Sequence, residues 1–83
     1  MDLNKLKIGI IDAMSKIVID DCSNSPYKGT PLESIAILDS LEYSSEKYKN
    51  WLLEKKDDFK INVEQIDDII KDCYTKTYDK FLE

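Results

Sequence analysis

Apolar residues recur every three or four positions over three stretches of the chain, which is the spacing of amphipathic helices. The first stretch covers residues 3–22, the second residues 31–57, and the third begins after Asn62 and reaches Phe81. Such a pattern predicts an all-α fold, a small three- or four-helix bundle of up-and-down topology. The length predicts a single helical domain over residues 1–83.

In residues 3–22 the apolar positions occupy most of the helical circumference. The narrow polar edge consists of Lys5, Asp12, Lys16 and Asp20. Asp2 is suited to cap this helix. A helix with so little polar surface is enclosed on most sides by its own fold or by another chain, so a homodimer is one hypothesis. The β-branched run at residues 16–20 also fits a strand, and helix is the main interpretation.

Residues 23–30 hold most of the helix-breaking residues and predict the one substantial loop. Thr30, Pro31 and Glu33 predict the next helix start, with a capping box and a proline in the first turn. One helix from residue 31 to 57 would be about 40 Å long, about 10 Å longer than the first. The Ser44–Ser45 pair is a natural place for a break. The pattern therefore leaves open one helix or two over residues 31–57.

The last helix has the best-marked start. Asn62 and Gln65 form a capping-box pair, and Ile61 and Ile66 stand at the two positions of a hydrophobic staple. Its predicted inner face consists of Ile66, Ile69, Ile70, Cys73, Thr77 and Phe81. On its outer face the spacing predicts two ion pairs, Asp67 with Lys71 and Asp72 with Lys76.

The chain has 12 lysines but no arginine and no histidine, and its formal net charge is −5. Without histidine there is no imidazole base, metal ligand or Ser/His or Cys/His nucleophile pair. Without arginine there is no bidentate clamp for phosphate. We therefore predict a protein that is not an enzyme, with no catalytic residue, metal or cofactor. The negative charge also argues against nucleic acid as a partner.

Charged residues interrupt every apolar run, so we expect neither a membrane span nor a signal peptide, and we expect a cytoplasmic protein without a membrane partner. Cys22 and Cys73 lack the spacing of a zinc or thioredoxin-like site and predict two buried, reduced cysteines. The lysine- and isoleucine-rich composition without arginine is typical of AT-rich coding, as in a low-GC bacterium or its phages.

These exclusions favour a non-catalytic protein–protein interaction module of the inhibitor, immunity or adaptor type. Tyrosine and tryptophan are common anchors of protein interfaces. The candidate partner-binding aromatic residues are Tyr43, Trp51, Tyr74 and Tyr78, each of which also fits a role in core packing. Glu64, Asp68 and Asp72 form a carboxylate stripe that suits a basic patch on another protein. An oligomeric structural or assembly subunit is an alternative.

The tripeptide Asp39-Ser40-Leu41, after an amphipathic helix and a long loop, resembles the motif of acyl and peptidyl carrier proteins. In that family a serine at a helix start carries phosphopantetheine. The resemblance implies that Ser40 is the attachment residue, and that residues 59–61 close the helix that follows. An atypical carrier protein modified at Ser40 is therefore the second alternative.

Overall fold

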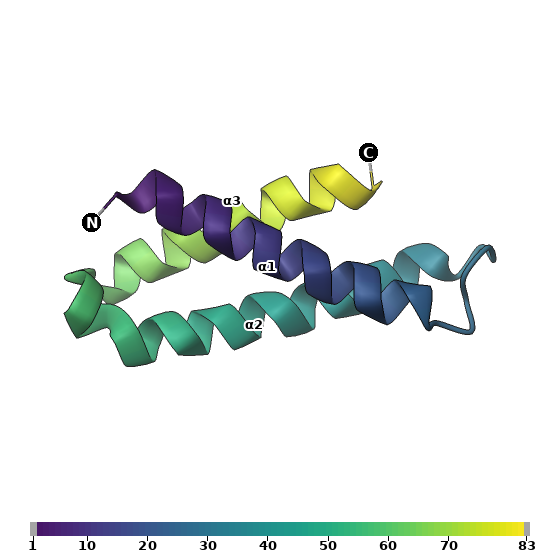
Figure 1. Ribbon diagram of the computed structural model, residues 1–83, viewed down its shortest axis with the longest axis horizontal. Helices are drawn as coiled ribbons and strands as arrows, with labels where there is room; N and C mark the ends of the chain where they lie inside the picture. Colours follow the sequence, from purple (N-terminus) through teal and green to yellow (C-terminus); the bar gives the residue numbers. More distant parts are fainter. Residues whose placement is uncertain (1, 83) are drawn as a thin grey trace.

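The computed structural model describes residues 2–82, and these form three helices without a strand. The helices are α1 (Leu3–Ser23), α2 (Glu33–Phe59) and α3 (Val63–Leu82). Figure 1 shows α1 and α3 running in the same direction and α2 running against both. The bundle is elongated, measuring 43 × 21 × 17 Å. The prediction of a small, all-α, up-and-down bundle is confirmed.

The first helix begins as the sequence predicts. The Asp2 carboxylate accepts hydrogen bonds from the backbone N–H groups of Asn4 and Lys5, at 3.0 and 3.4 Å. Residues 16–20 are helical, so the strand alternative is wrong. The predicted polar edge of α1 is exposed, whereas Ile10, Met14 and Val18 are buried against the other two helices.

The start of α2 differs from the prediction. The Thr30 hydroxyl accepts from the Leu32 N–H at 3.2 Å, and the Glu33 carboxylate accepts from the Gly29 N–H at 3.1 Å. The predicted reciprocal box between Thr30 and Glu33 is therefore replaced by two contacts within a tighter turn. Regular helix begins only at Glu33, and Pro31 lies in that turn.

Residues 31–57 do not break into two helices, because α2 is continuous for 27 residues. The Ser44 and Ser45 hydroxyls donate to the carbonyls of Leu41 and Glu42, one turn earlier in the same helix. Both hydroxyls thus bond to backbone carbonyls of α2 itself, and the helix continues through them. Ser44 is also fully buried, where a small side chain lets a neighbouring helix approach closely.

The turn between α2 and α3 depends on Lys60, which has a left-handed backbone with φ of 55°. The Ile61 N–H donates to the Lys56 carbonyl at 3.0 Å, and the Lys60 N–H donates to the Asp57 carbonyl at 3.4 Å. This pair of bonds is a Schellman motif, in which the left-handed residue is usually glycine. The capping box of α3 forms as predicted, with both Asn62–Gln65 bonds shorter than 3 Å.

One core joins the three helices. Its buried apolar residues are Ile10, Met14, Val18, Leu41, Leu52, Ile61, Ile66, Ile69, Ile70 and Cys73. The predicted inner face of α3 is confirmed, with Phe81 only partly buried at its end. Buried hydroxyls sit among these residues, and each donates to a carbonyl or carboxylate, as Thr77 does to the Cys73 carbonyl at 2.7 Å. Within residues 2–82 every buried polar side-chain atom has a partner, so the core carries no unpaired polar group.

Candidate protein-interaction site

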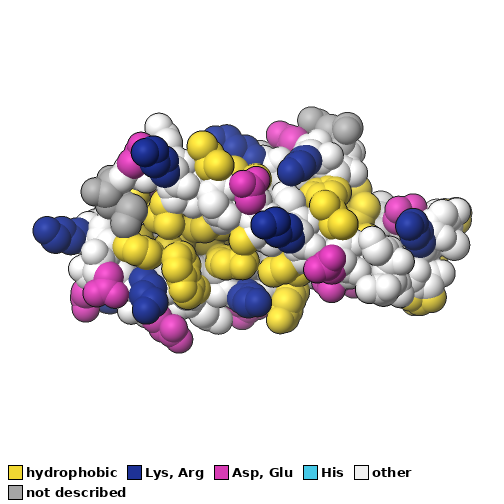
Figure 2. Space-filling view, viewed as in Figure 1, with side chains coloured by type: hydrophobic (Ala, Val, Ile, Leu, Met, Phe, Trp, Pro, Cys, Tyr) yellow, Lys and Arg dark blue, Asp and Glu magenta, His cyan; other side chains and the backbone are white. Residues whose placement is uncertain are grey.

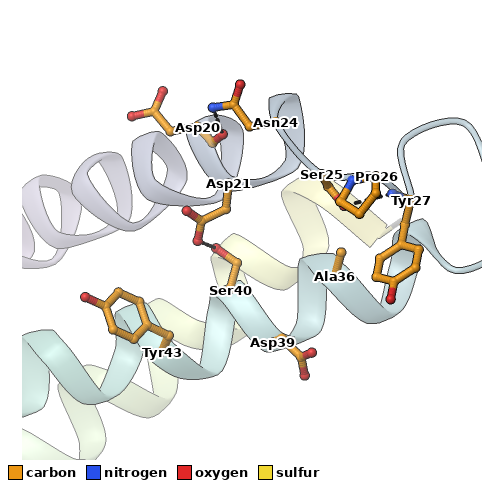
Figure 3. Close-up of a pocket in the computed structure, with 10 residues that line it drawn as sticks. All are labelled: Asp20, Asp21, Asn24, Ser25, Pro26, Tyr27, Ala36, Asp39, Ser40 and Tyr43. Carbon is orange, nitrogen blue, oxygen red and sulfur yellow. Dashed lines mark hydrogen bonds between the residues drawn. The ribbon is translucent and has the colours of Figure 1, made fainter.

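An open cleft of about 540 Å³ lies between the C-terminal end of α1, the loop that follows, and the N-terminal half of α2 (Figure 3). We call it the α1–α2 cleft. It is lined by Asp20, Asp21, Asn24, Ser25, Pro26, Tyr27, Ala36, Asp39, Ser40 and Tyr43. None of these residues comes from α3, so the cleft opens on a face that α3 does not cover.

Hydrogen bonds fix the walls of the α1–α2 cleft. The Ser40 hydroxyl donates to the Asp21 carboxylate at 2.8 Å and thereby joins α2 to α1. The Asn24 side-chain amide donates to the Asp20 carbonyl at 3.1 Å, and the Ser25 hydroxyl accepts from the Tyr27 N–H. The cleft is therefore built on two packed helices and a hydrogen-bonded turn.

Two tyrosines stand at opposite ends of the cleft in Figure 3 and remain open to solvent. Tyr43 is 61% exposed and Tyr27 is 45% exposed. Three aspartates line the space, and no lysine does. Carboxylates with flanking aromatic rings are the surroundings that favour a lysine or arginine side chain.

The position of Ser40 differs from what the carrier-protein resemblance implies. Ser40 is the eighth residue of α2 rather than its first, and it is only 5% exposed. Its hydroxyl already donates to Asp21. Attachment of a phosphopantetheine group needs a hydroxyl that another enzyme can reach, whereas the Ser40 side chain is largely buried at the wall of the cleft.

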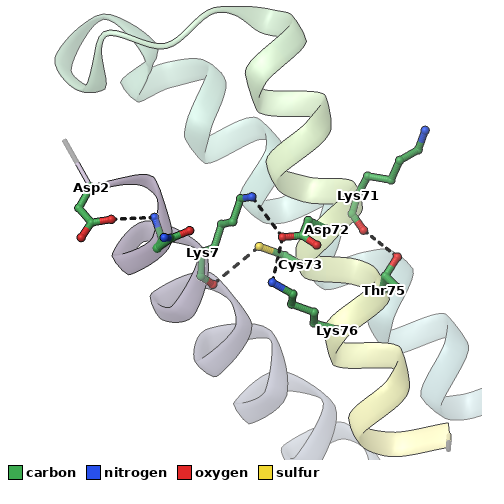
Figure 4. A network of polar contacts seen from close by, with 8 residues as sticks. Asp2, Lys7, Lys71, Asp72, Cys73, Thr75 and Lys76 are labelled. Atoms are coloured by element: carbon green, nitrogen blue, oxygen red, sulfur yellow. Dashed lines mark hydrogen bonds and ion pairs between the residues drawn. The ribbon is translucent and has the colours of Figure 1, made fainter.

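Asp72 lies between α1 and α3, where its carboxylate contacts Lys76 at 3.1 Å and Lys7 at 3.2 Å (Figure 4). Hydrogen bonds from Lys76 and then Lys7 lower the pKa of Asp72. The predicted Asp72–Lys76 pair thus forms, whereas Asp67 pairs with Lys49 of α2 at 3.3 Å in place of Lys71.

The carboxylate stripe of α3 is therefore divided. Glu64 and Asp68 are exposed, while Asp72 is half-buried and held by two lysines. Next to it, the Cys73 thiol donates to the Lys7 carbonyl at 3.7 Å. Burial raises the pKa of this thiol to about 11. This contact joins α1 to α3 and engages both the Asp72 carboxylate and the Cys73 thiol.

Trp51 packs in an aromatic cluster, with its ring centroid 6.3 Å from that of Tyr48 and 5.5 Å from that of Phe59. It is half-buried and lines a shallow groove of about 220 Å³ at Gly9 of α1. Figure 2 shows hydrophobic side chains gathered between the N-terminal half of α1 and the adjacent part of α2. This location fits the core-packing role for Trp51.

The other two predicted aromatic residues, Tyr74 and Tyr78, lie one turn apart on α3. Tyr74 is half-buried between α2 and α3, and burial, followed by the Glu42 carboxylate, raises its pKa. Tyr78 is 37% exposed on α3. Of the seven predicted partner-binding residues, three line hollows and each lines a different one: Tyr43 the α1–α2 cleft, Trp51 the groove at Gly9, and Tyr74 a hollow between α2 and α3.

Sequence reasoning missed most of the α1–α2 cleft, including Tyr27 and Asp39. The available signal was two pairs at i, i+4 spacing: Asp20 with Asn24, and Asp39 with Tyr43. Each pair predicts a polar face on its own helix. Only the packing of α1 against α2 brings the two faces together.

Within the described part of the chain, no group of three or more carboxylate or thiol side chains is arranged to hold a metal ion. Cys22 and Cys73 are both free thiols; Cys73 is buried as predicted, whereas Cys22 is only partly buried. None of the three helices is long and apolar enough to cross a membrane. Comparison of this chain with known protein families, with curated proteins and with solved structures finds no match.

Proposed function

We propose that this protein is a non-catalytic binding module that docks onto another protein through the α1–α2 cleft. One observation carries the proposal: two solvent-exposed tyrosines, Tyr27 and Tyr43, flank an open cleft lined by carboxylates. The partner presents a lysine or arginine side chain that enters between them. Inhibitor, immunity and adaptor proteins act in this way, because they bind another protein and catalyse no reaction themselves.

Preorganisation supports a binding role. The walls of the α1–α2 cleft are helices packed on a shared core, and the Ser40–Asp21 bond ties them together. A partner therefore does not have to order this surface, which lowers the entropic cost of association. A tyrosine contributes a large contact area with few rotatable bonds, so Tyr43 suits the role of an anchor.

Charge supports a basic partner. The chain carries −5 overall, and no lysine lines the cleft to neutralise Asp20, Asp21 and Asp39. Complementary charge raises the rate at which such a partner associates, and salt weakens that effect. Two free thiols support a reducing compartment, and we place the module in the cytoplasm of a low-GC bacterium or a cell infected by its phage.

Site-specific photo-crosslinking in the native cells tests this proposal. A photoreactive residue replaces Tyr43 in one variant and Thr75, an exposed position on α3, in a matched control. We expect Tyr43 to link to one protein through a peptide containing lysine or arginine, and Thr75 not to link to it. Absence of a crosslink at Tyr43, equal crosslinking at both positions, or crosslinking only to a second copy of this chain would overturn the proposal.

A further inference from the structure

Two large isoleucines on α1 remain uncovered by the bundle. Ile8 is 59% exposed and Ile19 is 51% exposed. They are eleven residues apart, so they lie on the same side of α1, separated by about 16 Å along its axis. Neither residue lines the α1–α2 cleft. Together with the exposed Asp12 and Lys16 between them they form what we call the outer face of α1; Ser15, in the same stretch, is buried and accepts a hydrogen bond from Lys80 of α3 at 3.4 Å.

An unused pair of opposite charges lies beside these isoleucines. Asp12 and Lys16 are both exposed, and no ion pair among residues 2–82 involves either of them. The midpoint between Ile8 and Ile19 falls between residues 13 and 14, and the midpoint between Asp12 and Lys16 falls at residue 14. The apolar pair and the charged pair are therefore centred on almost the same point of the helix.

This shared centre makes the outer face of α1 complementary to itself. A two-fold axis through that point brings Ile8 of each copy against Ile19 of the other copy. The same operation brings Asp12 of each copy near Lys16 of the other copy. This is the property of an isologous contact, in which residue i of one copy meets residue j of the other and residue j of the first meets residue i of the second.

We propose that the outer face of α1 binds a second copy of this chain, with the two α1 helices antiparallel. One helix face is smaller than a standard interface, so the dimer is weak and forms reversibly as concentration rises. The inference goes beyond the proposed function and does not depend on it, because none of the four residues that carry it lines the α1–α2 cleft.

Sedimentation over a wide concentration range, from about 10 μM to about 1 mM, measures this association. We expect the wild-type chain to shift from monomer to dimer. Ile8→Lys is expected to raise the dissociation constant at least about tenfold. Ile35→Lys, which changes a similarly exposed isoleucine on α2, is the control and leaves it unchanged. A wild-type chain that stays monomeric throughout, or equal effects of both variants, would overturn the proposal.

Disulfide trapping tests the antiparallel arrangement, in a Cys22→Ser background in which Cys73 stays buried. The double variant Ile8→Cys/Ile19→Cys is expected to form a covalent dimer on oxidation. Ile8→Cys alone is not, since the two copies of residue 8 lie about 16 Å apart along the axis and a disulfide needs Cα atoms within about 7 Å. Efficient trapping of the single variant would indicate parallel helices and refute the arrangement.

Charge exchange tests the polar part of the contact. Asp12→Lys places lysines opposite one another across the two-fold axis and is expected to weaken the dimer. Asp12→Lys/Lys16→Asp restores opposite charges and is expected to restore the dissociation constant. A double variant as weak as the single one would contradict the proposed register.

Discussion

The hydroxyl of Ser40 donates a hydrogen bond of 2.8 Å to the carboxylate of Asp21, joining two helices across 19 positions of the sequence. The bond sets the register in which α1 and α2 meet at their loop end. It also occupies the one hydroxyl that a carrier-protein role would require. The same contact thus bears on the fold and on the function.

Ser40→Ala is expected to lower the free energy of unfolding by about 1 kcal/mol, because it removes a bond between a hydroxyl and a charged acceptor. Chemical denaturation measures this change. Ser45→Ala is the control, since that hydroxyl bonds only within α2 and lies nearer solvent, and it should have little effect. If Ser40→Ala is as stable as wild type, the bond does not hold the two helices together.

Incubation with a phosphopantetheinyl transferase and coenzyme A is expected to leave the mass of the wild-type chain unchanged. The Ser40 side chain is buried and its hydroxyl is engaged, so the transferase has no accessible acceptor. Intact-protein mass spectrometry reads out the result. Addition of one phosphopantetheine group at Ser40 would contradict this expectation and support the carrier-protein hypothesis.

The two glycines are expected to respond to alanine in opposite directions. A Cβ at either position meets no atom within 4 Å, but Gly9 is in α1 whereas Gly29 has φ of 78°. Gly9→Ala should stabilise the protein by about 1 kcal/mol, through helix propensity. Gly29→Ala should destabilise it by about 1 kcal/mol, because alanine disfavours positive φ. Thermal unfolding measures the stability of both variants, and each variant serves as the control for the other.

Lys60→Gly is expected to raise the free energy of unfolding by about 1 kcal/mol. Lys60 has the left-handed backbone that closes the Schellman motif, and glycine adopts it without a Cβ clash. Lys56→Gly, one turn earlier inside α2, should instead cost about 1 kcal/mol. Equal losses in the two variants would show that residue 60 is not left-handed in solution.

The Asp72 carboxylate is expected to contribute to stability in a pH-dependent way. Its pKa is lowered in the folded state by Lys76 and Lys7, so its contribution is present above the ordinary carboxyl pKa of about 4. The contribution is lost as pH falls through the lowered value. The free energy of unfolding, measured at neutral and at acid pH, should therefore be lower for Asp72→Asn than for the wild type mainly near neutral pH.

Asp68→Asn is the matched control for Asp72→Asn. Asp68 is exposed on the same helix, and no ion pair among the described residues involves it. The free energy of unfolding of Asp68→Asn should therefore change with pH as that of the wild type does. A profile for Asp72→Asn that also follows the wild type would show that the contacts with Lys7 and Lys76 have no net effect.

The parts of the fold that the sequence predicts are those decided by neighbouring residues. The Asp2 cap and the Asn62–Gln65 box depend on backbone groups two or three positions away, and both form. The continuity of α2 was not predictable in the same way. Ser44, at the predicted break, is fully buried in the bundle, and the local sequence pattern does not reveal that burial.

The α1–α2 cleft was harder to predict for a related reason. Tyr43 was identifiable as a large aromatic residue, but its exposure depends on where α3 packs. Trp51, an equally good candidate by residue type, lies in a cluster with Tyr48 and Phe59. Asp21 and Ser40 come together only through the register of two helices, and no short-range pattern in the sequence encodes that register.

The central claim is that the protein acts by docking through the α1–α2 cleft, and the affinity of the crosslinked partner tests it most directly. Tyr43→Ala is expected to weaken binding at least about tenfold, and Asp39→Lys to weaken it and reduce its salt dependence. Tyr78→Ala, on a helix that does not line the cleft, should bind as wild type does. Full affinity in Tyr43→Ala, together with a loss in Tyr78→Ala, would contradict this account.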